Sequence, residues 1–389
     1  MSEPARAHYN VSTVALDCPP RRAVALAMSS PLRRRIGQLV IAGFGGASIP
    51  RELRSLAGDA GLGGVILFGR NIESPEQVAE VALAAHALPG ELPPWVSVDQ
   101  EGGRVARLGA PFTRWPPMRA LGRGDPALAA RFGRALACEL RAVGVTLDYA
   151  PVLDVDTNPD NPVIGDRALS AEAGHVAGLG AAVVDALQAG GVAACGKHFP
   201  GHGDTDADSH AELPVVSHAA DRLRAVELQP FRAAAAAGVA TIMTAHVLYP
   251  ALDDHLPATL SPRILGLLRD ELAFDGLLLS DDLEMKAIAG RYAVQEAAVR
   301  AVAAGCDMLL LCGADADRQA AAIEALIHAV EQERLPRARV EEALARQERV
   351  KARFLAGARA WRPPPSAELR ALVGREEHAA IAAEMEKSL

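Results

Sequence analysis

The sequence predicts a single-domain α/β fold, a (β/α)8 barrel of the TIM type. Eight short segments that are almost continuously apolar alternate along the chain with alanine-rich segments that have the composition of helices. The apolar segments show no clear two-residue alternation, which is typical of strands buried on both faces of a parallel sheet. Such a barrel takes about 250 residues, and more with insertions, so the 389 residues of the chain suffice.

The expected elements follow one another in a strand-then-helix order. Strands are expected at residues 39–44, 64–68, 95–99, 145–149, 192–195, 239–244, 277–280 and 308–311. Helices are expected at residues 75–88, 126–142, 171–189, 221–237, 261–273 and 293–304. Serines that suit a helix N-cap stand at three of the helix starts, at Ser74, Ser170 and Ser261.

An open doubly wound sheet is the alternative fold. It would require a phosphate-binding glycine motif after the first strand. The glycines of residues 43–48 do not have the GxGxxG spacing. We therefore interpret this segment as an ordinary loop and favour the barrel.

The chain divides into a barrel and two terminal segments. Residues 1–30 mix arginines with prolines and contain no apolar run of secretory length, and no later run approaches the length of a membrane span. We expect a loosely ordered N-terminal extension at 1–30, with Met28 as an alternative start. The catalytic barrel is expected at 31–360 and a helical C-terminal tail at 361–389. A cytoplasmic location without membrane attachment is expected.

Charge and cysteine content argue against nucleic-acid binding, a disulfide framework and a zinc site. The formal net charge is −8, with no basic stripe, so nucleic acid is not an expected partner. The five cysteines are odd in number and scattered without a CxxC pair, which argues against a disulfide framework or a zinc site and fits a reducing compartment.

Polar residues gather where the expected strands end, and that face carries the active site of a TIM barrel. The densest group is 197–210, KHFPGHGDTDADSH, in which a lysine, three histidines and three aspartates follow an apolar strand. Four other strands lead to polar segments, which are 99–107, 154–167, His246 and 280–285. A single such segment could be a helix cap, but five together indicate an active site.

These segments resemble the glycoside hydrolase family 3 β-N-acetylhexosaminidases, in particular the short single-domain branch that acts on cell-wall muropeptides. The matching motifs are DQEGGRVARL (99–108), NPVIGDRALS (161–170), KHFPGHGDTDADSH (197–210) and SDDLEM (280–285). They occur in the family's order, and the third is long and unusual. The family often carries a further α/β sandwich domain, so a lone barrel suits the single-domain branch.

The resemblance implies the catalytic residues. Asp281 falls on the nucleophile of a retaining mechanism, in which a carboxylate attacks the anomeric carbon. His210 falls on the acid/base, with Asp208 as its partner. A histidine can serve here because it titrates near neutrality, so it can donate a proton and later accept one.

The resemblance also implies the residues that hold the sugar, which are Asp99, Arg107, Arg167, Lys197 and His198. His246 is expected near the site in a supporting role. Neither a cofactor nor a metal is implied. The aspartates at 204, 206 and 208 do resemble the start of a calcium loop, but the later glycine and glutamate of such a loop are out of register. A hydrolytic metal site at Asp204, Asp208 and His210 is a further alternative.

The expected function is that of an exo-acting β-N-acetylglucosaminidase. The resemblance implies removal of terminal GlcNAc from GlcNAc-1,6-anhydro-MurNAc and its peptide forms during peptidoglycan recycling, by a monomer whose partner is the small glycan substrate. Two alternatives are enzymes, a β-glycoside phosphorylase and a β-glucosidase of the same family. A third is a non-catalytic muropeptide-binding barrel.

Overall fold

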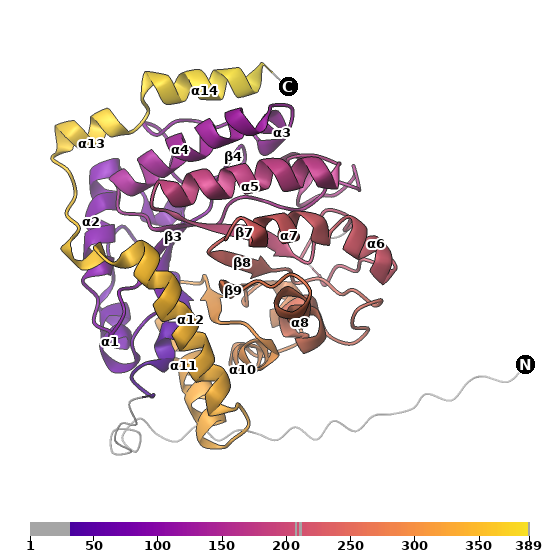
Figure 1. The fold of residues 1–389 in the computed structure, drawn as a ribbon. Coiled ribbons are helices and arrows are strands. Elements are labelled where there is room, and N and C mark those ends of the chain that lie inside the picture. The colour runs from indigo at the N-terminus through magenta and orange to yellow at the C-terminus, as the bar shows by residue number, and fades with distance from the viewer. Residues whose placement is uncertain (1–31, 207, 210–211, 388–389) are drawn as a thin grey trace, which may run out of the picture.

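Eight parallel strands form a closed barrel. The computed structural model describes residues 32–206, 208–209 and 212–387. The barrel strands follow one another in the order β1-β10-β9-β8-β7-β6-β3-β2, and helices surround them (Figure 1). The predicted (β/α)8 barrel is confirmed. The predicted N-terminal extension, residues 1–30, lies outside the described residues.

Each predicted strand has a counterpart in the barrel. The barrel strands are β1 (Val40–Ala42), β2 (Gly64–Leu67), β3 (Trp95–Val98), β6 (Leu147–Asp148), β7 (Ala193–Phe199), β8 (Thr241–Thr244), β9 (Leu277–Asp282) and β10 (Met308–Leu311). β7 and β9 extend further than predicted, so that Lys197, His198 and Asp281 lie within strands.

A short antiparallel hairpin, β4 (Gln100–Gly102) and β5 (Val105–Ala106), follows β3 and was not predicted. Its turn uses Gly102 and Gly103 at φ values of 115° and 56°. Such angles are accessible mainly to glycine.

Each of the six predicted helices has a counterpart among the helices of the described residues. They are α1 (Arg51–Ala60), α2 (Pro75–His86), α3 (Met118–Leu121), α4 (Pro126–Ala142), α5 (Ala173–Ala189), α6 (Ala220–Ala225), α7 (Leu228–Ala236), α8 (Pro262–Asp270), α9 (Lys286–Ala289), α10 (Val294–Ala304), α11 (Ala316–Glu331), α12 (Arg337–Leu355), α13 (Ser366–Leu372) and α14 (Glu376–Glu386). The hydroxyl oxygens of Ser74 and Ser261 accept from Gln77 N and Ile264 N, as expected of N-caps.

Two helix predictions were wrong in detail. α5 begins two residues later than expected, with Glu172 in place of Ser170 at the N-cap. The helix expected at 221–237 is divided into α6 and α7. Pro230 explains the division, because it has no N–H to donate to the carbonyl of Val226 and its ring crowds that carbonyl.

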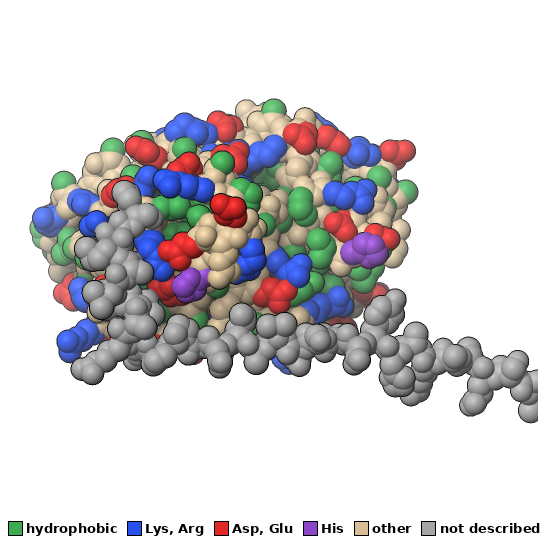
Figure 2. Space-filling model, turned by 90° about the horizontal axis from the view of Figure 1, so that it is seen from below, with side chains coloured by type: hydrophobic (Ala, Val, Ile, Leu, Met, Phe, Trp, Pro, Cys, Tyr) green, Lys and Arg blue, Asp and Glu red, His purple; other side chains and the backbone are tan. Residues whose placement is uncertain are grey.

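The surface carries charges of both signs. On the face shown in Figure 2, lysine and arginine side chains are interspersed with aspartate and glutamate, and neither sign forms a large continuous area. Over residues 32–387, apart from 207, 210 and 211, no helix is long and apolar enough to cross a bilayer.

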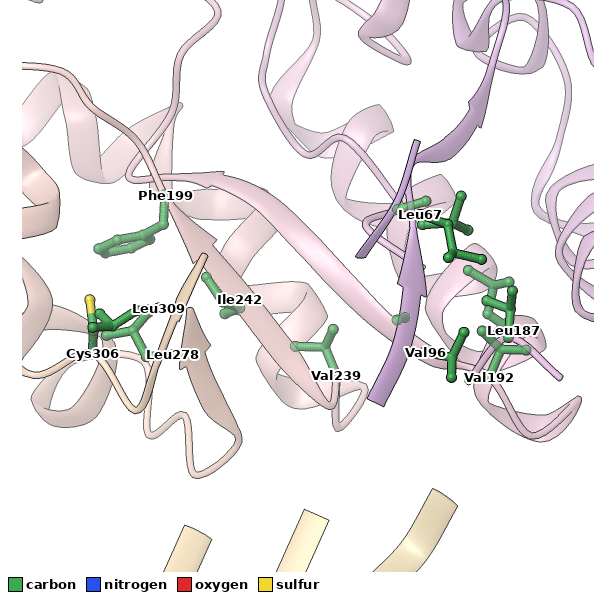
Figure 3. Close-up of a cluster of buried hydrophobic side chains, with 14 of the residues drawn as sticks. Leu67, Val96, Leu187, Val192, Phe199, Val239, Ile242, Leu278, Cys306 and Leu309 are labelled. Carbon is green, nitrogen blue, oxygen red and sulfur yellow. The ribbon is translucent and has the colours of Figure 1, made fainter. Parts of the chain in front are cut away.

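The hydrophobic core has two layers. The inner layer fills the barrel with side chains that include Ile66, Tyr149 and Met243. The outer layer packs between strands and helices, and Figure 3 shows part of it, where Val96 lies near Leu187 of α5. A strand buried on both sides needs apolar residues at every position, which explains the unbroken apolar segments of the sequence.

Three helices near the C-terminus, α12, α13 and α14, pack against the outside of the barrel. α12 lies at the amino ends of the strands, where Phe354 and Leu355 join the inner core and the Phe354 ring lies 6.2 Å from that of Trp95. α13 packs against α2 and α4, and α14 packs against α4 (Figure 1). The amino end of the barrel is therefore closed, while the carboxyl end remains for the site.

Candidate active site

A pocket of about 180 Å³ lies at the carboxyl ends of the barrel strands. Ile66, Tyr149, Met243 and Leu310 line it from below and belong to the inner core of the barrel. The pocket therefore has a closed, apolar floor. Its polar wall includes six of the predicted site residues, which are Asp99, Arg107, Arg167, Lys197, His198 and Asp281.

Lys197 is the centre of an ion-pair chain on one side of the pocket. Its Nζ lies 2.8 Å from Asp99 Oδ1 and 2.6 Å from Glu101 Oε1. Arg167 makes a two-point contact with Glu101, at 2.9 Å through Nε and 2.8 Å through Nη2. Arg107 lies further out, with Nη2 3.6 Å from Asp99 Oδ2. Three cations and two carboxylates thus interlock at the pocket wall.

The ion-pair partners of Lys197 and Glu101 keep both side chains charged although both are buried. The side chains of Lys197 and Glu101 are 2% and 1% exposed. Burial alone would raise the pKa of Glu101, but Arg167 and Lys197 outweigh it and hold that pKa below its ordinary value. Burial would lower the pKa of Lys197, but Asp99 and Glu101 outweigh it and raise that pKa. Each partner therefore keeps the other ionised.

His198 is oriented by a second buried carboxylate. Its Nδ1 lies 2.7 Å from Asp154 Oδ2, while Asp154 Oδ1 accepts the backbone N–H groups of His198 and His202. Burial acts to raise the pKa of Asp154, but the two histidines lower it. A carboxylate on Nδ1 fixes the ring and leaves Nε2 for another contact.

Asp281 lies on β9 at the pocket wall, and Asp282 N donates to its Oδ1 at 2.8 Å. Burial favours its neutral form, but His246, His198 and the Asp282 N–H outweigh burial and lower the pKa of Asp281. Asp282 shows the opposite shift, because burial and the charge of Asp281 raise its pKa to about 6. The pKa values of these two adjacent carboxyl groups therefore differ, and Asp281 ionises more readily than Asp282.

His246 lies behind these residues. Its Nδ1 is 2.7 Å from Thr259 Oγ1, and its Nε2 is 2.9 Å from the carbonyl oxygen of Asp282. It is fully buried and does not line the pocket. It can therefore support the end of β9 from behind the pocket wall. Its supporting role in the site stays a prediction.

The segment after β7 returns to the pocket through His202 and Ser209, which both line it. His202 lies 2.8 Å from Thr205 Oγ1 through Nδ1 and 3.3 Å from Ser209 Oγ through Nε2. Burial and the charge of His198 lower the pKa of His202 to about 4, so His202 is neutral at pH 7. Ala287 N of α9 donates to Ser209 O at 3.2 Å, which joins this segment to the element that follows Asp281.

The two predicted acid/base residues are placed differently. Asp208 is half-buried, one residue before the pocket-lining Ser209. His210 lies outside the described residues. Asp204, an alternative metal ligand, contacts Thr157 Oγ1 at 2.8 Å and His218 Nε2 at 2.6 Å. Among the residues that the structure describes, no three His, Cys, Asp or Glu side chains are grouped to hold a metal ion.

Comparison with known proteins agrees with this arrangement. The model of the glycosyl hydrolase family 3 N terminal domain matches residues 31–350. The chain belongs to glycoside hydrolase family 3. Among its relatives, the β-hexosaminidase of Nitrosomonas eutropha is 44% identical over 258 residues, which cover 64% of this chain and 74% of the relative. That of Pseudomonas aeruginosa is 43% identical over 291 residues, covering 73% and 85%.

Solved structures of family 3 proteins share the fold. A β-N-acetylglucosaminidase from Paenibacillus sp. str. FPU-7 superposes with a TM-score of 0.87 at 42% identity, covering 92% of this chain and 69% of that one. NagZ from Neisseria gonorrhoeae superposes with a TM-score of 0.73 at 31% identity, covering 90% and 97%. The predicted enzyme class, a glycoside hydrolase of the β-N-acetylhexosaminidase type, is confirmed at the level of the family and its β-hexosaminidase relatives.

Sequence reasoning assigned no role to two residues of this family 3 site. Glu101 binds both Lys197 and Arg167, and Asp154 binds His198. A signal existed for Glu101, since it lies two residues from Asp99 in the DQEGG motif. Asp154 carries a weaker signal, as one of two aspartates after the fourth strand.

Proposed function

We propose that this family 3 enzyme is a retaining exo-β-N-acetylglucosaminidase. Its substrates are muropeptides, GlcNAc-1,6-anhydro-MurNAc and the peptide-bearing forms, and its role is peptidoglycan recycling. The observation that carries the proposal is the position of Asp281, a carboxyl group of lowered pKa in the same small pocket as Lys197 and His198. The β-hexosaminidase relatives favour an N-acetylated sugar as substrate.

The shape of the pocket favours exo action. A pocket with a closed floor admits the end of a glycan, whereas internal cleavage requires an open groove. At about 180 Å³ the pocket is also smaller than the roughly 300–1,000 Å³ of sites that enclose drug-sized ligands. One terminal sugar is the proposed occupant.

The charged wall suits a pyranose. Asp99 can accept hydrogen bonds from two sugar hydroxyls, and Lys197, Arg107 and Arg167 place donors around it. His198, held by Asp154, offers its Nε2 to another hydroxyl. Because the ion pairs fix these groups before the sugar arrives, little side-chain freedom is lost on binding.

Catalysis then proceeds in two steps. Asp281 attacks the anomeric carbon and forms a glycosyl-enzyme, while His210, paired with Asp208, donates a proton to the leaving oxygen. His210 next removes a proton from the water that releases the sugar. The lowered pKa of Asp281 keeps its carboxylate ionised at neutral pH, as a nucleophile requires.

Mass spectrometry of a trapped intermediate tests the proposal. Incubation with a 5-fluoro GlcNAc donor should add the mass of one sugar to the peptide that contains Asp281, and hydrolysis of 4-nitrophenyl β-GlcNAc should be blocked. Asp281→Asn should form no adduct and lose about 10³-fold or more in kcat. An active wild-type enzyme without an adduct at Asp281 would exclude the covalent route.

A further inference from the structure

Asp148 is a fully buried carboxyl group outside the proposed mechanism. It ends β6, next to Leu147, which faces the inner core of the barrel, so its own side chain lies on the outer side of the sheet. Its Oδ1 accepts the backbone N–H of Gln100 at 2.9 Å. Its Oδ2 is buried and has no hydrogen-bond partner among the described residues.

Gln100 continues this contact toward the pocket. Its side-chain Oε1 accepts from the backbone N–H groups of Arg107 and Leu108, at 2.8 and 2.9 Å, and its Nε2 donates to Leu108 O at 3.2 Å. Gln100 is 2% exposed, so these bonds form away from solvent. One residue thus ties the start of the β4–β5 hairpin to its return strand.

The residues held in this way are the ones that grip the sugar. Gln100 lies between Asp99 and Glu101, and its side chain fixes the backbone at Arg107. We infer that Asp148 is a positioning residue, which acts through Gln100 to hold Asp99 and Arg107 at the distance that the sugar requires. This inference rests on the proposed function, in which Asp99 and Arg107 bind the sugar.

The surroundings of Asp148 favour its neutral form. No described lysine or arginine lies within ion-pair distance of it, and the nearby Asp99 and Glu101 are negative. Burial, followed by the charges of these two carboxylates, raises its pKa well above the ordinary value despite the opposing effects of Gln100 N–H and Lys197. A neutral carboxyl oxygen still accepts an N–H bond, so an amide should replace it.

The steady-state kinetics of 4-nitrophenyl β-GlcNAc hydrolysis test this role. Asp148→Asn should keep KM within about twofold of wild type, because the amide oxygen can accept from Gln100 N. Asp148→Ala loses one buried hydrogen bond, which is worth about a factor of ten, and should raise KM about tenfold with little change in kcat. Gln100→Leu loses three and should raise KM at least as much. Thr241→Val, which removes a buried hydroxyl bonded to Ala194 O on a neighbouring strand, is the matched control and should leave KM unchanged.

Each outcome decides the matter. If Asp148→Asn is as impaired as Asp148→Ala, the neutral acid is wrong, and if Asp148→Ala and Gln100→Leu keep the wild-type KM, the positioning role is wrong. A KM rise in Thr241→Val would mean that general loosening explains the effect. Should Asp148→Ala fail to fold, the Asn and Gln100→Leu variants still decide. Asp99→Ala separates the two proposals: a wild-type KM there overturns the proposed sugar grip itself.

Discussion

Individual residues in this site owe their charge to their neighbours. Glu101, almost fully enclosed, remains ionised because Lys197 and Arg167 both contact it. A buried ion pair adds little net stability relative to apolar side chains, but removing one partner leaves a buried charge unpaired. We therefore expect this cluster to fix Lys197 in place rather than to add net stability to the fold.

Replacing Glu101 tests that reasoning. Glu101→Gln should lower the free energy of unfolding by about 3–5 kcal/mol, because two buried cations lose a carboxylate partner. KM for the aryl glycoside should also rise as Lys197 shifts. Urea denaturation and steady-state kinetics measure the two effects.

The matched control for this change is Glu296→Gln. Glu296 forms an exposed pair with Arg300 on α10, and such pairs contribute at most about 1 kcal/mol. Equal unfolding free energies for the two variants would show that Lys197 and Arg167 are held by other contacts.

At the scale of elements, the C-terminal helices brace the segment that follows the β4–β5 hairpin. Glu139 of α4 accepts from Thr113 and Gly374, and its Oε1 lies 2.8 Å from His378 Nδ1 of α14. Thr113 lies six residues beyond Arg107, so the last helices and the pocket are joined through one buried carboxyl group.

Gly374 is the tightest point of this junction. Its φ is 61°, and a Cβ added there would lie 2.0 Å from Pro111 O. Gly374→Ala should therefore lower the free energy of unfolding by on the order of 1–3 kcal/mol, from overpacking and an unfavourable backbone angle. Thermal unfolding followed by circular dichroism gives the measurement.

Gly357→Ala is the control for that substitution, because a Cβ there meets no atom within 4 Å. We expect it to change stability by less than about 0.5 kcal/mol, as for other surface substitutions. Equal melting temperatures for the two alanine variants would show that the backbone at Pro111 can shift to accommodate the added Cβ.

Elements were easier to predict than their contacts. Buried parallel strands are marked by unbroken apolar runs, so all eight were found, and the polar strand ends located the pocket. The pairing of Glu101 with Arg167 joins residues 66 positions apart, and no local pattern encodes it. Likewise, the division between α6 and α7 depends on the single Pro230. The other residues of 221–237 favour one continuous helix, so composition alone predicts no break.

At the scale of the whole molecule, the charged groups at the two ends of the barrel have different surroundings. At the carboxyl end, charged groups line a pocket that is open to substrate. At the amino end, Asp307 is enclosed by Arg269, Arg339 and Arg346. Nearby, Lys351 of α12 is 1% exposed and donates to Gln38 Oε1 and Gly63 O, each at 2.9 Å, with no described carboxylate in contact. The charged groups at the amino end therefore contact one another rather than a pocket. Lys351 differs from them because its described partners are uncharged oxygen atoms.

Lys351 should make the stability of the molecule depend on pH. Burial lowers its pKa from 10.5 to about 7 in the folded chain. Between these values the unfolded chain binds a proton that the folded chain does not, so stability rises with pH across this window. The slope is about 1.4 kcal/mol per pH unit, or about 4–5 kcal/mol in total. Below pH 7 the folded chain must hold the buried ammonium, and the benefit is absent.

Comparing wild type with Lys351→Met isolates this contribution from other titrating groups. The unfolding free energy of wild type minus that of the variant, measured in urea from pH 6 to pH 9, should be flat below about pH 7 and then rise. Lys387→Met, at an exposed position just after α14, is the control for loss of a lysine. A difference that stays constant across pH 7–9 would mean that Lys351 remains charged inside the fold. Gln38 and the Gly63 carbonyl would then suffice to solvate an ammonium group at the closed end of the barrel.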